Sequence, residues 1–168
     1  DEDQLSSLFN GWQSIEEHTR FVAQELQDLL QHLRLNAETE CNALTHAVPW
    51  HDIGKNHPGW QEAVVTALAE AAITGKEAHK PFAKFSLSQS PLIRDENDKP
   101  RFTGKELGHE LKKLSRHFKP SASHEVASAL AFRQAEQERL GLERDTVLAS
   151  LLAEYVIMSH HGRVRKVL

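Results

Sequence analysis

The chain has 168 residues, which is the size of a single domain, and a net charge of −4. Its composition, with 39% hydrophobic and 26% charged residues, excludes a disordered tail, and no apolar run approaches the roughly 18 residues of a membrane span. The single cysteine, Cys41, excludes an internal disulfide and a cysteine-rich zinc site, whereas 11 histidines and 24 acidic residues leave room for a histidine–carboxylate metal site.

The two ends of the sequence indicate a piece of a longer protein. The chain begins Asp1-Glu2-Asp3 without a methionine, and its last residues, 163–168, carry no stop signal of their own. We therefore expect residues 1–168 to form one domain of a chain whose C-terminal part is missing. No signal peptide is visible, so we expect a cytoplasmic protein with no membrane partner.

Charge is unevenly distributed along the chain. Residues 1–98 hold 7 basic and 16 acidic side chains, whereas residues 99–168 hold 13 basic and 8 acidic ones. A basic second half could face phosphates. Charged helices that only face solvent produce the same pattern, and charge alone favours that simpler interpretation.

Nearly all of the chain is predicted to be helical. Ser14 and Glu17 form a capping box that opens the first helix, and His18 shares its apolar stripe with Val22, Leu26, Leu29 and Leu33. A second helix is expected over residues 37–50, with Pro49 kinking or stopping it. Pro58-Gly59 is expected to start a third, whose inward face is Trp60, Val64, Leu68 and Ala71.

Residues 75–104 interrupt this helical pattern. Glycine, proline and serine punctuate a mostly polar stretch there, which predicts a long irregular insertion. Helices are expected again over residues 105–117, from Ser121 or Ser123 onward, and from a cap at Asp145. The predicted inward face of the last helix consists of Val147, Leu148, Leu151, Leu152, Tyr155 and Val156. No strand alternation is visible, so the predicted fold class is all-α.

Histidines near the predicted helix ends are the main candidates for chemistry. They are His18, the adjacent pair His51-Asp52, His124, and the pair His160-His161. A buried imidazole or carboxylate is costly unless it is paired, and a metal ion is one way to pair it. Ligands on different helices of a bundle can converge on one interior point.

The pair His51-Asp52 is the most informative of these. An aspartate has two oxygens and can bridge two metal ions about 3.5–4 Å apart. Gly54 permits a close backbone approach or a positive φ. Lys55 could place an ammonium beside a phosphate.

The run His51-Asp52-Ile53-Gly54-Lys55 resembles the HD-x-G-K motif of the HD metal-dependent phosphohydrolase superfamily. Within that superfamily, the chain resembles the HD nuclease domain of the type I CRISPR-associated helicase–nuclease, over residues 14–162. The blocks that carry this resemblance are Ser14-Ile15-Glu16-Glu17-His18-Thr19, Lys55-Asn56-His57-Pro58-Gly59-Trp60-Gln61, Ser123-His124-Glu125 and Ser159-His160-His161-Gly162.

The resemblance implies an HD-domain helical bundle that cuts single-stranded DNA with the help of metal ions. It implies that His18, His51 and Asp52 hold one ion, and that Asp52 bridges to a second ion held by His124, His160 and His161. Asp52 and Lys55 would be the catalytic residues, with Lys55 contacting the scissile phosphate. The implied partners are single-stranded DNA, a helicase domain or subunit, and a CRISPR effector complex.

The implied cofactor is one or two divalent transition-metal ions. Mn, Ni, Co, Fe or Zn suit this ligand set better than Mg, because imidazole favours softer ions than an all-oxygen site does. The family also has a further aspartate well after the double histidine, but here the last acidic residue is Glu154. We expect that ligand on the missing C-terminal part, which leaves the first ion short of a carboxylate.

Other interpretations of the same residues stay open. The chain could be an HD phosphohydrolase acting on nucleotides or cyclic dinucleotides, or a degenerate HD scaffold that docks a helicase or effector subunit. One of His160 and His161 could bind an ion while the other contacts substrate. Arg163 and Arg165 could bind the DNA backbone or simply lead into a following domain.

Overall fold

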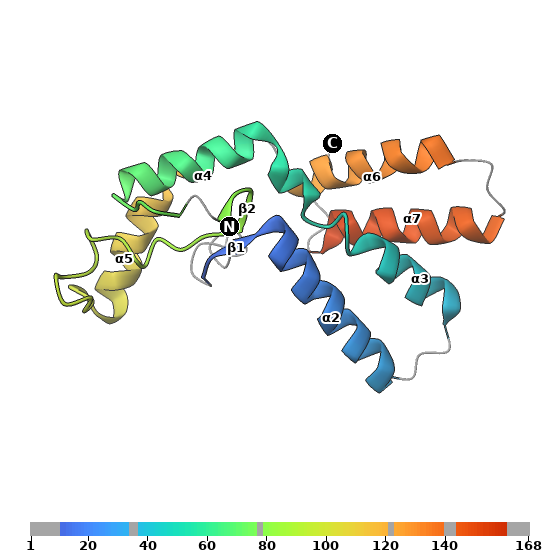
Figure 1. Ribbon diagram of the computed structural model, residues 1–168, viewed down its shortest axis with the longest axis horizontal. Helices are drawn as coiled ribbons and strands as arrows, with labels where there is room; N and C mark the ends of the chain where they lie inside the picture. Colours follow the sequence, from blue (N-terminus) through green and yellow to red (C-terminus); the bar gives the residue numbers. More distant parts are fainter. Residues whose placement is uncertain (1–10, 34–36, 77–78, 121–122, 140–143, 161–168) are drawn as a thin grey trace. The chain divides into compact units, whose positions relative to one another are not determined.

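The structure, a computed structural model, describes residues 11–33, 37–76, 79–120, 123–139 and 144–160 (Figure 1). Its elements are β1 (Gln13–Ser14), α2 (Ile15–Leu33), α3 (Glu38–Ala47), the 3-10 helix η1 (Ile53–Asn56), α4 (Pro58–Glu70), β2 (Phe82–Lys84), α5 (Gly104–Ser115), α6 (His124–Arg139) and α7 (Arg144–Ser159). Most of the described residues are helical, which confirms the predicted all-α class at this level. The assignment to an HD bundle stays a prediction.

Backbone contacts divide the chain into two units. The described residues of the first unit fall within 1–15 and 58–122, and those of the second fall within 16–57 and 123–168. The first unit is thus mostly an insertion, in sequence, between the two segments of the second. Each unit has its own apolar core.

The first unit contains α4, α5 and the two short strands. Trp60, Val64 and Leu68 lie on the buried face of α4, as their spacing predicts. The described part of residues 75–103 contains no α-helix, as expected, but it supplies much of this core through Phe82, Phe85, Leu87 and Ile93.

This unit contains two short strands, although the sequence shows no strand alternation. β1 and β2 pair in antiparallel fashion, with Gln13 opposite Lys84 and Ser14 opposite Phe82. Strands of two and three residues are too short to show an alternating pattern in the sequence. The side chain of Gln61 supports β2, because its amide and its oxygen each bond the backbone of Phe82 at 2.9 Å.

The second unit contains α2, α3, η1, α6 and α7, and it holds all the described candidate ligands. Within it, α7 packs against both α3 and α6, and η1 packs against α6 (Figure 1). The core consists of small residues around two large ones: Ala43, Ala47, Ala129, Ala153, Phe132 and Ile157. Small side chains at these contacts allow the helices to approach closely.

The helix boundaries of this unit follow the sequence signals. α2 starts directly after Ser14, α3 ends at Ala47 two residues before Pro49, and α6 starts directly after Ser123. The side chain of His18 is 13% exposed, so it lies inward as predicted. None of the described helices is both long and apolar enough to cross a membrane.

The buried face of α7 agrees only in part with the predicted one, since Leu152 and Val156 pack against the core as predicted. Val147, Leu148, Leu151 and Tyr155 are exposed, whereas Ala153 and Ile157 are completely buried. The helix is apolar on most sides, so its sequence does not single out one stripe. It also begins at Arg144, which places Asp145 inside the helix rather than at its cap.

Candidate metal centre

Asp52 lies at the centre of a cluster of four histidines drawn from separate elements. His51 and Asp52 lie in the turn between α3 and η1, and His18 comes from the first turn of α2. His124 is the first residue of α6, and His160 directly follows α7. Helix ends therefore position most of the cluster, and all of it belongs to the second unit.

The two carboxylate oxygens of Asp52 face different pairs of histidines. Oδ2 lies 3.2 Å from His18 Nε2 and 3.7 Å from His51 Nε2. Oδ1 lies 3.3 Å from His124 Nε2 and 3.5 Å from His160 Nε2. The structure thus brings together two groups that could each hold an ion, His18–His51–Asp52 and Asp52–His124–His160, with the candidate ligand atoms of each group within 4.8 Å of one another.

The imidazole rings surround the carboxylate closely. Ring centroids are 5.3 Å apart for His18 and His51, and 5.5 Å apart both for His51 and His160 and for His124 and His160. The Asp52 side chain is 2% exposed, whereas the histidine side chains keep 10–15% exposure. Access to this centre is therefore over the edges of the rings.

The hydrogen bond made by His51 fixes which of its ring nitrogens can bind a cation. His51 Nδ1 lies 2.6 Å from the backbone oxygen of Val48. A carbonyl can only accept, so Nδ1 carries the proton and Nε2 presents a lone pair. That buried Nε2 has no hydrogen-bond partner among the described residues. The Nε2 lone pair faces Asp52 Oδ2, which is itself an electron-pair donor, so a cation bound beside that oxygen would satisfy the imidazole nitrogen.

His160 repeats this arrangement at the end of α7. Its Nδ1 donates to the backbone oxygen of Ile157 at 2.7 Å, which directs the Nε2 lone pair toward Asp52 Oδ1. In both cases the carbonyl three residues earlier orients the ring. Backbone or carboxylate partners of this kind are the usual support of metal-binding histidines. The donor set and its orientation therefore fit a divalent cation.

Electrostatics keep the centre in the protonation state that binds cations. Burial raises the pKa of Asp52, but the ammonium of Lys55 is the largest opposing influence, and this pKa lies well below its usual range. Burial lowers the pKa of His51, although the Asp52 carboxylate and the Val48 carbonyl oppose that effect. An ionised carboxylate and a neutral imidazole are the forms that bind metal.

The ammonium of Lys55 contacts Asp52 Oδ2, the same oxygen that faces His18 and His51. Its ammonium is 2.7 Å from Asp52 Oδ2, and both side chains are buried. The structure therefore places Lys55 in the cluster, where it neutralises Asp52. Its predicted contact with a phosphate stays a prediction.

Gly54 allows the turn that carries Asp52 to lie against α6. A Cβ at Gly54 would collide with the backbone oxygen of His124 and lie 2.7 Å from the backbone nitrogen of Ser128. The Gly54 N–H also donates to the buried Ser128 Oγ at 2.8 Å. Gly54 therefore serves the close approach of two backbones, one of the two roles expected from the sequence, and not a positive φ.

Some predicted site residues lie outside the described part of the chain, namely His161, Arg163 and Arg165. The other histidines in the described part belong to neither ligand group. Sequence reasoning missed the supporting partners Val48, Ile157 and Ser128. The carbonyls of Val48 and Ile157 each lie three residues before the histidine that they orient, but no residue type indicates such a bond in the sequence. Ser128 could have been recognised only by its position on a face of the predicted helix.

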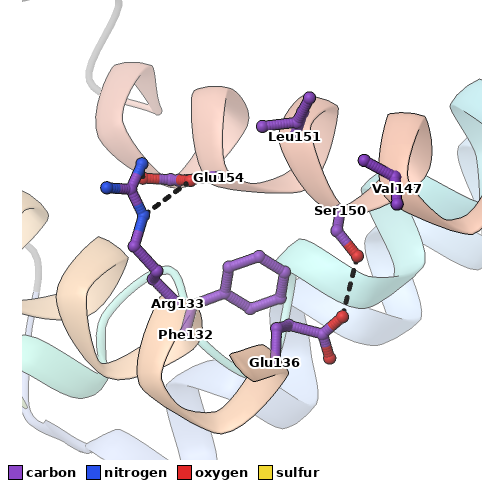
Figure 2. A pocket seen from close by; sticks show the side chains of 7 residues that line it. All are labelled: Phe132, Arg133, Glu136, Val147, Ser150, Leu151 and Glu154. Carbon is purple, nitrogen blue, oxygen red and sulfur yellow. Dashed lines mark hydrogen bonds and ion pairs between the residues drawn. The ribbon is translucent and has the colours of Figure 1, made fainter. Parts of the chain in front are cut away.

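A separate groove lies between α6 and α7, away from the metal-binding groups (Figure 2). It measures about 290 Å³, and Phe132, Val147 and Leu151 form its apolar wall. Two polar bridges cross from α6 to α7 there, Arg133 to Glu154 at 2.7 Å and Ser150 to Glu136 at 2.7 Å. These bridges hold the helices that carry His124 and His160.

No protein-family model matches the sequence, and no curated protein or solved structure is significantly similar to it. The resemblance to HD nucleases therefore rests on the sequence motifs, and the metal centre rests on its own geometry.

Proposed function

We propose that this chain is a metal-dependent nuclease of the HD type, which hydrolyses phosphodiester bonds of single-stranded DNA beside a helicase in type I CRISPR interference. One observation carries the hydrolase part of this proposal. The two oxygens of Asp52 face two separate histidine pairs, as expected of a carboxylate that bridges two ions. The choice of DNA and of a helicase partner comes from the order of the four motif blocks.

The residues of the centre have distinct tasks in this proposal. His18 and His51 complete one ion site on Oδ2, and His124 and His160 complete the other on Oδ1. Ions held there would activate water for in-line attack on phosphorus and offset charge on the phosphate oxygens. With cations bound at Asp52, the ammonium of Lys55 would no longer be its main counterion and could serve a phosphate oxygen of the substrate.

The test is cleavage of circular single-stranded DNA by the chain with Mn²⁺ or Ni²⁺. A circle reports internal cutting because it has no ends. We expect linear product from the wild type, and only background cleavage from Asp52→Asn or in the presence of a chelator. Asp98→Asn is the matched control, since Asp98 is 84% exposed and outside the cluster, and it should cut like the wild type.

The other outcomes separate the competing functions. Hydrolysis of a small phosphodiester such as bis-p-nitrophenyl phosphate, with an intact circle, would replace the nuclease with a phosphohydrolase for nucleotides or cyclic dinucleotides. Bound metal without hydrolysis of either substrate would favour the docking scaffold. A chain that binds no divalent ion would overturn the proposal altogether.

A further inference from the structure

His124 differs from His51 and His160 in what lies beside its second ring nitrogen. His51 and His160 each use the backbone carbonyl three residues earlier. His124 is the first residue of α6. A helix presents N–H groups rather than carbonyls at its start. A side chain can take the part of the carbonyl instead.

Glu125 is in position to do so. Its Oε2 lies 3.5 Å from His124 Nδ1, and both side chains are nearly buried, at 12% and 11% exposure. Ser123 Oγ donates to the same oxygen, which holds it on the Nδ1 side of the ring. The ring of His124 therefore lies between two carboxylates, with Nδ1 toward Glu125 and Nε2 toward Asp52 Oδ1 at 3.3 Å.

We propose that Glu125, held by Ser123, is a positioning residue that orients His124 and strengthens it as a ligand of the ion on Asp52 Oδ1. The inference rests on the proposed function, because it needs an ion at that oxygen. A carboxylate increases the basicity of an imidazole ligand, and the loss of such a partner typically weakens metal affinity by about 10–100-fold. The ion held by Asp52, His124 and His160 should therefore depend on Glu125, and the ion held by His18, His51 and Asp52 should not.

The experiment measures Co²⁺ affinity by calorimetry in two backgrounds that each keep one group. His18→Ala leaves Asp52–His124–His160, and His160→Ala leaves His18–His51–Asp52. In the His18→Ala background, Glu125→Ala should weaken binding by about 10–100-fold and change the Co²⁺ absorption band. Glu125→Gln keeps an acceptor oxygen without the charge and should weaken it less. In the His160→Ala background, both changes should leave the affinity within about twofold.

Two further variants test whether the effect is specific to the Glu125 carboxylate and its position. Glu25→Ala removes an exposed carboxylate of the same unit, on α2, that belongs to neither group, and it should leave Co²⁺ affinity unchanged. Ser123→Ala frees the Glu125 carboxylate without removing its charge, and it should weaken the same ion as Glu125→Ala does. It provides the test if Glu125→Ala does not fold.

The outcomes separate this inference from the proposed function. Two ions bound by the wild type, with no effect of Glu125→Ala in the His18→Ala background, would overturn the inference alone. Equal losses in both backgrounds would show a merely structural role and would also overturn it. A wild-type chain that binds no ion would overturn the proposed function and the inference together.

Discussion

Lys55 Nζ lies 2.7 Å from Asp52 Oδ2, and neither side chain reaches solvent to any useful extent. The same oxygen faces His18 and His51, which form one of the two candidate ion sites. The protein thus carries its own counter-cation for Asp52. Without metal, the lysine is what makes a buried carboxylate tolerable among acceptor nitrogens.

Replacing this lysine should make stability depend on metal. Lys55→Met keeps the length of the side chain but leaves the Asp52 carboxylate without its cation, which costs about 3–5 kcal/mol when one partner of a buried pair is removed. A divalent cation restores the missing charge, so Mn²⁺ should recover part of that loss. Urea unfolding of the variant with a chelator and with Mn²⁺ measures both effects.

Lys113→Met is the control for this prediction. Lys113 is 65% exposed and lies 3.8 Å from Glu110, so its loss should change the free energy of unfolding by less than about 0.5 kcal/mol. If Lys55→Met is as stable as the wild type in chelator, Lys55 is not the counter-cation of Asp52.

The pH dependence of stability follows from two lowered pKa values in the metal-free protein. Burial raises the pKa of Asp52, but the Lys55 ammonium is the largest opposing influence, and this pKa lies well below the ordinary 3.8. Its contribution is therefore complete above about pH 4 and is lost as the pH falls further toward the folded-state pKa. Burial lowers the pKa of His51 below 6.5, so stability should already begin to fall as the pH drops below 6.5.

Unfolding free energies between pH 3 and pH 8, measured in chelator, test these two pH windows. His51→Gln should remove part of the slope just below pH 6.5, and Asp52→Asn should remove part of it below about pH 4. Superimposable profiles of the wild type and both variants would contradict the assigned protonation states.

The sequence predicted the described members of the cluster because several of them follow from local rules. His18 shares an apolar stripe, His51 and Asp52 are adjacent, and His124 and His160 lie at helix ends. The division of the histidines into two groups about Asp52 came from the family resemblance rather than from these local rules, because it depends on how α6 and α7 pack.

Gly54 should be far less tolerant of a side chain than Gly108. Gly54→Ala forces a methyl group into the backbone of α6, so η1 must separate from it. We expect a loss of about 3 kcal/mol or more and much weaker metal binding. Gly108 lies within α5 with open space around it, and Gly108→Ala should stabilise the protein by about 0.5–1 kcal/mol. Thermal unfolding and Co²⁺ titration of the two variants give the comparison, which fails if they behave alike.

The buried face of α7 can be tested by a pair of truncations. Ile157 is completely buried, so Ile157→Ala should cost about 2–5 kcal/mol. Leu151 is 57% exposed, and Leu151→Ala should cost less than about 1 kcal/mol. Unfolding by urea measures both losses of stability. A larger loss for Leu151→Ala than for Ile157→Ala would support the buried face that the sequence predicted.

Neither pattern nor composition could have settled that face. Four of the larger apolar residues of α7 are exposed, namely Val147, Leu148, Leu151 and Tyr155, whereas the small Ala153 is buried together with Ile157. Packing between helices that approach closely selects size as well as polarity. The same reasoning explains residues 75–104, whose polar composition hid the core contacts of Phe82 and Phe85.

Because residues 58–122 are inserted between the two segments of the second unit, the two ligand groups assemble in different ways. His18, His51 and Asp52 all come from the segment before the insertion, whereas His124 and His160 come from the segment after it. The first group can assemble from one continuous stretch of chain, but the second exists only when the two segments have met across Asp52. An ion at Asp52 Oδ1 would thus link the two segments. Binding of that ion during refolding would report when the two segments come together.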